Sequence, residues 1–104
     1  MNIQKLMKEA QKAQRKAAEV QERLGQMTVV GSAGGGLVEV TANGHGQIQA
    51  VRLKPEAVHQ DDLEALEDLL LAAIQDAQQK AHQLSEKEMS RELGGIGSML
   101  GNLL

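Results

Sequence analysis

The stretch that decides the fold is residues 28–54, which read TVVGSAGGGLVEVTANGHGQIQAVRLK. It is rich in valine, which favours strands, and glycines divide it into three short runs. In the second run Val38, Val40 and Ala42 alternate with polar residues, so they share one face of a strand. Pro55 ends the third run. The pattern predicts a three-stranded antiparallel sheet.

The connection between the second and third runs is a predicted hairpin. Asn43-Gly44 supplies the positive φ angles that a tight turn needs. In the third run, apolar residues at both Ile48 and Val51 break strict alternation. An extra residue in a strand reverses the side on which later residues lie, so we expect a β-bulge near Ala50.

The glycine run at residues 31–36, GSAGGG, invites comparison with a phosphate-binding loop. It lacks the Lys-Ser/Thr ending of such loops, and it leads into a strand, so no helix N-terminus is available for a phosphate. We interpret it as a flexible or close-packed turn between strands.

The segment before the sheet is a predicted helix from about Asn2 to Leu24, with Gly25 as its stop. Its apolar residues recur at steps of three and four, forming a seam that we expect to contact a second helix, with Ile3 and Leu6 packing on it. The seam consists of Ile3, Leu6, Ala10, Ala13, Ala17, Val20, Leu24 and Met27.

The segment after the sheet is a second predicted helix, with Asp61 as N-cap and Glu64 completing a capping box. Its apolar face is broad at the start, where we expect it to cover the sheet, and narrow toward its end near Leu93. Residues 94–104, GGIGSMLGNLL, have no usable period and are expected to form a flexible tail. The prediction is an α+β chain: one α-β-β-β-α domain over 1–93, and a tail over 94–104.

The composition favours association with a second copy. The 104 residues include no Phe, Tyr or Trp, and residues 1–92 contain only 20 Ile, Val and Leu. Burying one such side chain contributes about 1.5 to 3 kcal/mol, whereas ordering a domain of this size costs on the order of 100 kcal/mol. A stable monomer is therefore not expected.

Several classes of function are disfavoured. The chain has no Cys, so disulfides and thiolate metal sites are excluded, and it shows no charged-then-apolar leader, so we expect a cytoplasmic protein. No apolar run approaches the roughly 20 residues of a membrane span. His45, His59 and His82 are not expected to converge, and His82 with Glu86 offers only two metal ligands. We predict no catalysis, metal, cofactor or small-molecule substrate.

The charge is unevenly placed. The net charge is −3, but residues 1–27 hold six basic and three acidic residues. Four of the basic residues form a stripe about 15 Å long opposite the apolar seam, long enough to follow several phosphates of a duplex. These are Lys5, Lys8, Lys12 and Arg15; Lys16 and Arg23 lie beside the seam, and Lys80, Lys87 and Arg91 form a weaker row on the second helix.

Two interpretations of the stripe stay open at this point. The first is a DNA-binding dimer. The second is a protein-protein adaptor that uses its helices and tail, in which the charges only solvate the outer helix face. Deleting residues 94–104 separates them: the adaptor gains support if function in the cell is lost while DNA retention is unchanged.

The order of elements, together with several short words, resembles the YbaB/EbfC family of bacterial nucleoid-associated proteins. The resemblance covers nearly the whole chain and rests on the order and spacing of these words rather than on any one of them. They are MNIQKLMKEAQKAQ, GSAGGGLVEVTANGHGQI, VRLKPE and GGIGSMLG.

The resemblance implies a tweezer-like homodimer whose sheets form a shared core, double-stranded DNA bound with little sequence preference, and a cytoplasmic, nucleoid-associated location. On this sequence the family's charged helix residues fall on Lys5, Lys8, Lys12, Arg15 and Lys16, and also on Lys87 and Arg91. We add Arg23 as a DNA contact. The residues expected at the dimer interface are Leu37, Val38, Val40, Val51 and Leu53.

Overall fold

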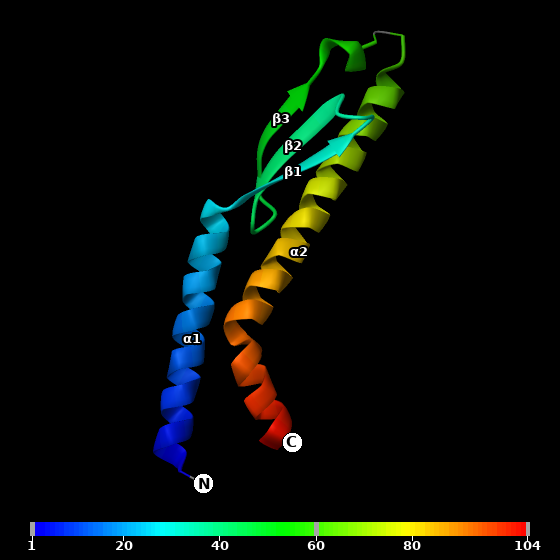
Figure 1. The fold of residues 1–104 in the computed structure, drawn as a ribbon. Coiled ribbons are helices and arrows are strands. Elements are labelled where there is room, and N and C mark those ends of the chain that lie inside the picture. Colours follow the sequence, from blue (N-terminus) through cyan, green and yellow to red (C-terminus); the bar gives the residue numbers. More distant parts are fainter. Residues whose placement is uncertain (1, 60, 104) are drawn as a thin grey trace.

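The computed structural model describes residues 2–59 and 61–103, with side chains up to residue 94. The elements follow in the order α1 (Ile3–Gln26), β1 (Thr28–Ala33), β2 (Val38–Asn43), β3 (Ile48–Leu53), a 3-10 turn (Pro55–Ala57) and α2 (Leu63–Leu103). The sheet has the order β1-β2-β3, and both pairings are antiparallel (Figure 1). The predicted order of helix, three-stranded antiparallel sheet and helix is confirmed.

Both helices begin at a side chain that accepts free backbone N–H groups. The Asn2 side chain accepts from two N–H groups in the first turn of α1. Asp62 Oδ1 accepts from the N–H of Ala65 at 3.0 Å, so the N-cap of α2 is Asp62 and the prediction of Asp61 is wrong by one residue. The first helix continues two residues beyond its expected end at Leu24.

The core is a thin layer between α2 and the sheet. Val38, Val40 and Ala42 of β2 are fully buried, and so are Ala73 and Ala77 of α2. Larger side chains near the start of α2 pack around this centre, as expected from the broad apolar face. Because α2 packs against β1 and β2 rather than β3, one part of the sheet has no helix over it (Figure 1).

The glycine run separates into a packed residue and a turn. Gly31 lies in β1 beneath α2, where an added Cβ would come within 2.2 Å of the Ala77 backbone nitrogen. Gly34, Gly35 and Gly36 have φ angles of 65°, 67° and 93° and form the turn between β1 and β2. The predicted inter-strand turn is confirmed, and the close approach falls on the strand that precedes it.

The predicted bulge is confirmed within one residue. Thr41 pairs with Ala50, whereas Ala42 pairs with Ile48. Gln49 is therefore the extra residue on β3.

The connection from β2 to β3 differs from the expected two-residue turn. The loop is longer, and its positive φ belongs to Gly46 (81°), not to Asn43 or Gly44. The buried Asn43 organises the loop instead, because its Oδ1 accepts from the backbone N–H groups of His45 at 3.0 Å and Gln47 at 3.1 Å.

The molecule is elongated, with extents of 70 × 24 × 16 Å and a radius of gyration of 19.8 Å. A compact domain of about 100 residues has a radius of gyration of about 13 Å. The excess comes from α1 and α2, which run antiparallel away from the sheet (Figure 1). The helical backbone of α2 continues to Leu103, past the expected end near Leu93. Four glycines weaken this end, but no proline breaks it.

Candidate functional site

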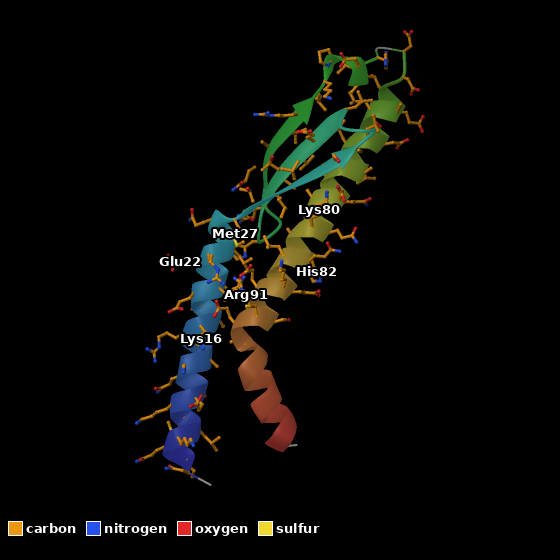
Figure 2. The ribbon with its side chains drawn as sticks, in the orientation of Figure 1. Lys16, Glu22, Met27, Lys80, His82 and Arg91 are labelled. Atoms are coloured by element: carbon orange, nitrogen blue, oxygen red, sulfur yellow. The ribbon has the colours of Figure 1, made fainter. Side chains whose placement is uncertain are left out.

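The projecting part of α1 carries a group of basic side chains, which we call the α1 cations: Lys5, Lys8, Lys12, Arg15 and Lys16. The first four are exposed and Lys16 is half-buried. Among the residues whose side chains the structure describes, none of the five takes part in an ion pair. Figure 2 shows Lys16 on α1 well below the sheet. Their charge is therefore available to a polyanion.

The apolar seam of α1 is buried only near the sheet. Val20 and Leu24 are fully buried, but Ile3 and Leu6 keep 71% and 37% of their surface exposed. The expectation that Ile3 and Leu6 pack on the second helix is not met within one chain. The amino-terminal part of α1 is thus an arm that projects from the body.

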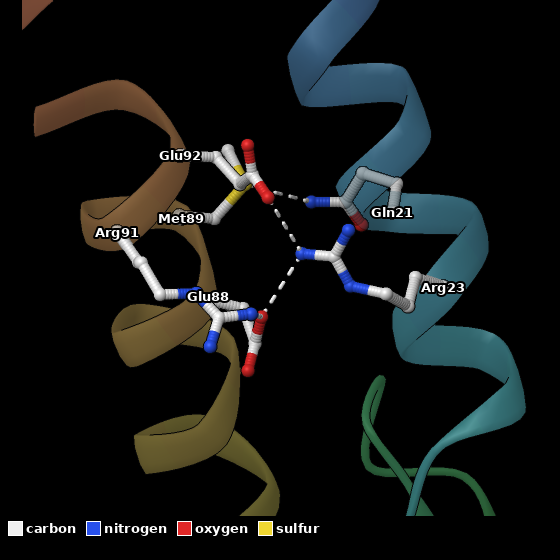
Figure 3. Close-up of polar contacts among 6 residues, drawn as sticks. All are labelled: Gln21, Arg23, Glu88, Met89, Arg91 and Glu92. Atoms are coloured by element: carbon white, nitrogen blue, oxygen red, sulfur yellow. Dashed lines mark hydrogen bonds and ion pairs between the residues drawn. The ribbon is translucent and has the colours of Figure 1, made fainter.

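A cluster of four charged residues joins the helices where they leave the body, and we call Arg23, Glu88, Arg91 and Glu92 the arginine cluster (Figure 3). Arg23 Nη2 donates to Glu88 Oε2 at 2.9 Å and to Glu92 Oε1 at 3.3 Å, and Arg91 Nη2 donates to the same Glu88 oxygen. Glu88 is buried, and its hydrogen bond is the main cause that raises the pKa of the Arg23 guanidinium.

Two predicted DNA contacts, Arg23 and Arg91, are therefore already paired inside the protein. Sequence reasoning missed Glu88 as their partner. The spacing of Glu88 and Arg91, three residues apart on one helix, was visible in the sequence. The contact with Arg23 was not, because it depends on how α1 and α2 pack.

The three basic residues of the row on α2 differ in their contacts; Figure 2 labels Lys80 and Arg91 on this helix. Lys80 Nζ lies 3.0 Å from Asp76 Oδ2 and donates to the carbonyl of Val30 at 3.1 Å. The backbone N–H of Ser32 donates to the same Asp76 oxygen at 2.9 Å. The pKa of Asp76 is lowered, mainly by the hydrogen bond from Ser32 and next by the contact with Lys80. Asp76 and Lys80 thus occupy the edge of β1, whereas Lys87 is exposed.

The residues expected at a dimer interface lie in two environments. Val38 and Val40 are buried by α2 within the single chain, and Leu37 is half-buried. Val51 and Leu53 on β3 remain 46% and 42% exposed. Of the five residues, Val51 and Leu53 are therefore the most open to solvent in the single chain.

Two histidines come closer than the sequence predicts. His45 and His82 line one depression of about 390 Å³ beside α2, together with Gly44, Gly46, Gln78, Ala81 and Ser85. His82 Nε2 lies 2.8 Å from Glu86 Oε1. Within the described residues, no three His, Cys, Asp or Glu side chains are grouped to hold a metal ion.

Helices long and apolar enough to cross a membrane are absent from the described part of the chain.

Known proteins with similar sequences align with this chain over nearly their whole length. A nucleoid-associated protein of Thermus thermophilus is 76% identical over an alignment of 105 positions, which covers 99% of each chain. A nucleoid-associated protein of Chloroflexus aurantiacus is 48% identical over 92% of this chain and 96% of its own. The crystal structure of an uncharacterized protein from Helicobacter pylori, 20% identical, has the same fold with a TM-score of 0.72 over 84% of this chain and 91% of that chain. A model of the YbaB/EbfC DNA-binding family matches residues 1–96, and the protein therefore belongs to that family.

Proposed function

We propose that this chain forms a homodimer that binds double-stranded DNA with little sequence preference, through basic residues on its projecting helices. The observation that carries the proposal is the set of α1 cations, which form no ion pair with the side chains that the structure describes and lie on an arm that extends away from the body. Lysine and arginine side chains along one ridge neutralise phosphates without reading bases, so the affinity depends little on sequence. The names of the relatives support DNA in the nucleoid as the partner, and we propose a cytoplasmic, nucleoid-associated location.

The acidic residues favour one direction of approach. The first turns of α2 and the two residues before them, at the opposite end of the body from the arm, carry exposed carboxylates that repel a duplex. The duplex is therefore expected to lie along the arms. The exposed acids are Asp61, Asp62, Glu64, Glu67 and Asp68.

The test is a gel-shift titration with salt, using random and defined duplexes. Binding through phosphates weakens linearly on a log-log plot, and the slope falls by about 0.9 for each phosphate contact removed. Replacing Lys5, Lys8, Lys12 and Arg15 by Gln should flatten the slope and weaken binding to both duplexes equally. Binding that ignores salt, or a Gln variant that binds like the wild type, rejects this site.

A single pair of variants supplies the matched control. Lys12→Gln and Lys54→Gln each remove one exposed lysine, but Lys54 lies beside the sheet and not on the arm. Only Lys12→Gln should change the salt slope. Sedimentation must show that both variants keep the oligomeric state of the wild type.

A further inference from the structure

The arginine cluster is built around a buried carboxylate. Glu88 is 4% exposed and accepts from guanidinium groups on two different helices. Burying a carboxylate is strongly unfavourable unless cations compensate it, so the two arginines are held to Glu88. Arg23 Nε is buried without a hydrogen-bond partner among the described residues, so Arg23 is held by its Nη2 contacts rather than by a complete set of hydrogen bonds.

The same two arginines have the chemistry of phosphate ligands. The planar guanidinium donates to carboxylates and to phosphates with the same geometry. The side chains of Arg91 and Arg23 remain 61% and 39% exposed, so an external anion can reach both. A phosphate that approaches the base of the arms therefore meets two cations whose charge Glu88 and Glu92 together balance.

We infer that Glu88 competes with DNA phosphates for Arg23 and Arg91 and thereby limits the affinity of the protein for DNA. This inference rests on the proposed function. In this arrangement the α1 cations provide the phosphate contacts, and the two arginines add contacts only when Glu88 releases them. Glu88 is a positioning residue, because it acts through the arginines and not on the DNA itself.

The decisive variant is Glu88→Gln, which keeps the size and the hydrogen-bonding oxygen but removes the charge. It should bind random duplex more tightly and with a steeper salt dependence, by about 0.9 in slope per subunit, because Arg91 gains one phosphate while Glu92 still pairs with Arg23. The control is Glu86→Gln, which also removes a carboxylate from α2. The Glu86 carboxylate is exposed, and its ion-pair partner is His82 rather than an arginine. Both variants are measured at pH 8. Each has lost one negative charge, so the general reduction in repulsion between protein and DNA is the same in both, and only the release of the arginines differs. Equal slopes in the two variants overturn the inference.

A second measurement does not depend on the folding of Glu88→Gln. In the otherwise unchanged protein, Arg91→Gln should leave the salt slope as it is, whereas Lys12→Gln lowers it by about 0.9. If Arg91→Gln lowers the slope as much as Lys12→Gln does, Arg91 contacts DNA despite Glu88 and the inference is wrong. If neither variant lowers the slope, the site on α1 is rejected, and the inference falls with the proposed function.

Discussion

At the residue scale, Gly31 lies where β1 passes so close to α2 that a side chain does not fit. The Cβ of an alanine at position 31 would meet the backbone of Ala73 and Ala77 at 2.2 to 2.6 Å. Backbone cannot move aside as a flexible side chain does, so α2 would have to shift off β1. We predict that Gly31→Ala lowers the free energy of unfolding by at least the roughly 1 to 3 kcal/mol typical of overpacking. Urea denaturation at fixed protein concentration measures it.

Gly94→Ala is the matched control for this prediction. Its added Cβ has no atom within 4 Å, and the residue lies in α2. Alanine is the better helix former by about 1 kcal/mol, so this variant should be as stable as the wild type or slightly more stable. A Gly31→Ala protein as stable as Gly94→Ala would show that α2 does not lie on β1 as described.

At the same scale, the hairpin marks what local sequence can and cannot predict. The Asn-Gly pair at positions 43 and 44 correctly predicted where the chain turns. The expected cause, positive φ angles at these two residues, was wrong. Gly44 is required because a Cβ there would lie 2.6 Å from the carbonyl oxygen of Leu24, and its N–H donates to that oxygen at 2.8 Å. This contact joins residues far apart in the chain, so turn propensities do not contain it.

At the scale of elements, the edge of β1 is closed by side chains from α2. Asp76 accepts from the N–H of Ser32, and Lys80 donates to the carbonyl of Val30. Exposed strand edges pair readily with other chains, and charged side chains at an edge oppose such pairing. The period of the α2 sequence identified its apolar face, but it did not show that two polar side chains would reach a strand.

The lowered pKa of Asp76 predicts how this contact responds to pH. A carboxyl whose pKa is lower in the folded state stabilises the fold above its unfolded pKa, and that contribution is lost as the pH falls through the folded pKa. Asp76→Asn should therefore unfold at a lower temperature than the wild type at pH 7, and the difference should shrink as the pH falls below about 4.

Asp68→Asn is the control, because it also removes an exposed carboxylate from α2. Among the described residues, the Asp68 side chain has no hydrogen bond and no ion pair. Its melting temperature should follow that of the wild type more closely at every pH. An Asp76→Asn difference that stays constant from pH 7 to pH 3 would contradict the assignment.

The carboxyl end of α2 gives a prediction about dynamics. Its backbone is helical to Leu103, yet the composition of residues 94–104 led us to expect a flexible tail, and we retain that expectation as a proposal. Each glycine weakens a helix interior by about 1 kcal/mol relative to alanine. Amides of residues 94–103 should exchange with deuterium much faster than those of residues 73–88. Equal protection of the two segments would reject the flexible tail.

At the scale of the whole molecule, the sequence already contained the uneven charge and the shortage of apolar residues. It could not show which cations are free. Arg23 and Arg91 are bound to Glu88, and Lys80 is bound at the β1 edge, because each contact depends on how distant segments pack. The α1 cations agree best with the sequence prediction. Helix periodicity placed them on the face opposite the apolar seam, and because the arm projects from the body, no distant segment covers that face among the described residues.

The small number of large apolar residues available for a hydrophobic core also supports the proposed dimer. β3 is an edge strand, α2 packs mainly against β1 and β2, and Val51 and Leu53 are exposed on β3. Apolar side chains beside a free strand edge favour pairing with a second copy. Folding should then depend on association, so the unfolding midpoint of the wild type should rise with protein concentration.

A lysine at position 51 tests this proposal directly. Val51→Lys places a charge on β3, and Leu71→Lys places the same charge on an exposed apolar position of α2. Sedimentation at micromolar concentration should show a dimer for the wild type and for Leu71→Lys. Val51→Lys should sediment as a monomer and be largely unfolded at concentrations at which the wild type is folded, because a buried unpaired charge opposes the contact. A wild-type protein that sediments as a stable folded monomer, or a Val51→Lys dimer as tight as the wild type, would remove β3 as the interface.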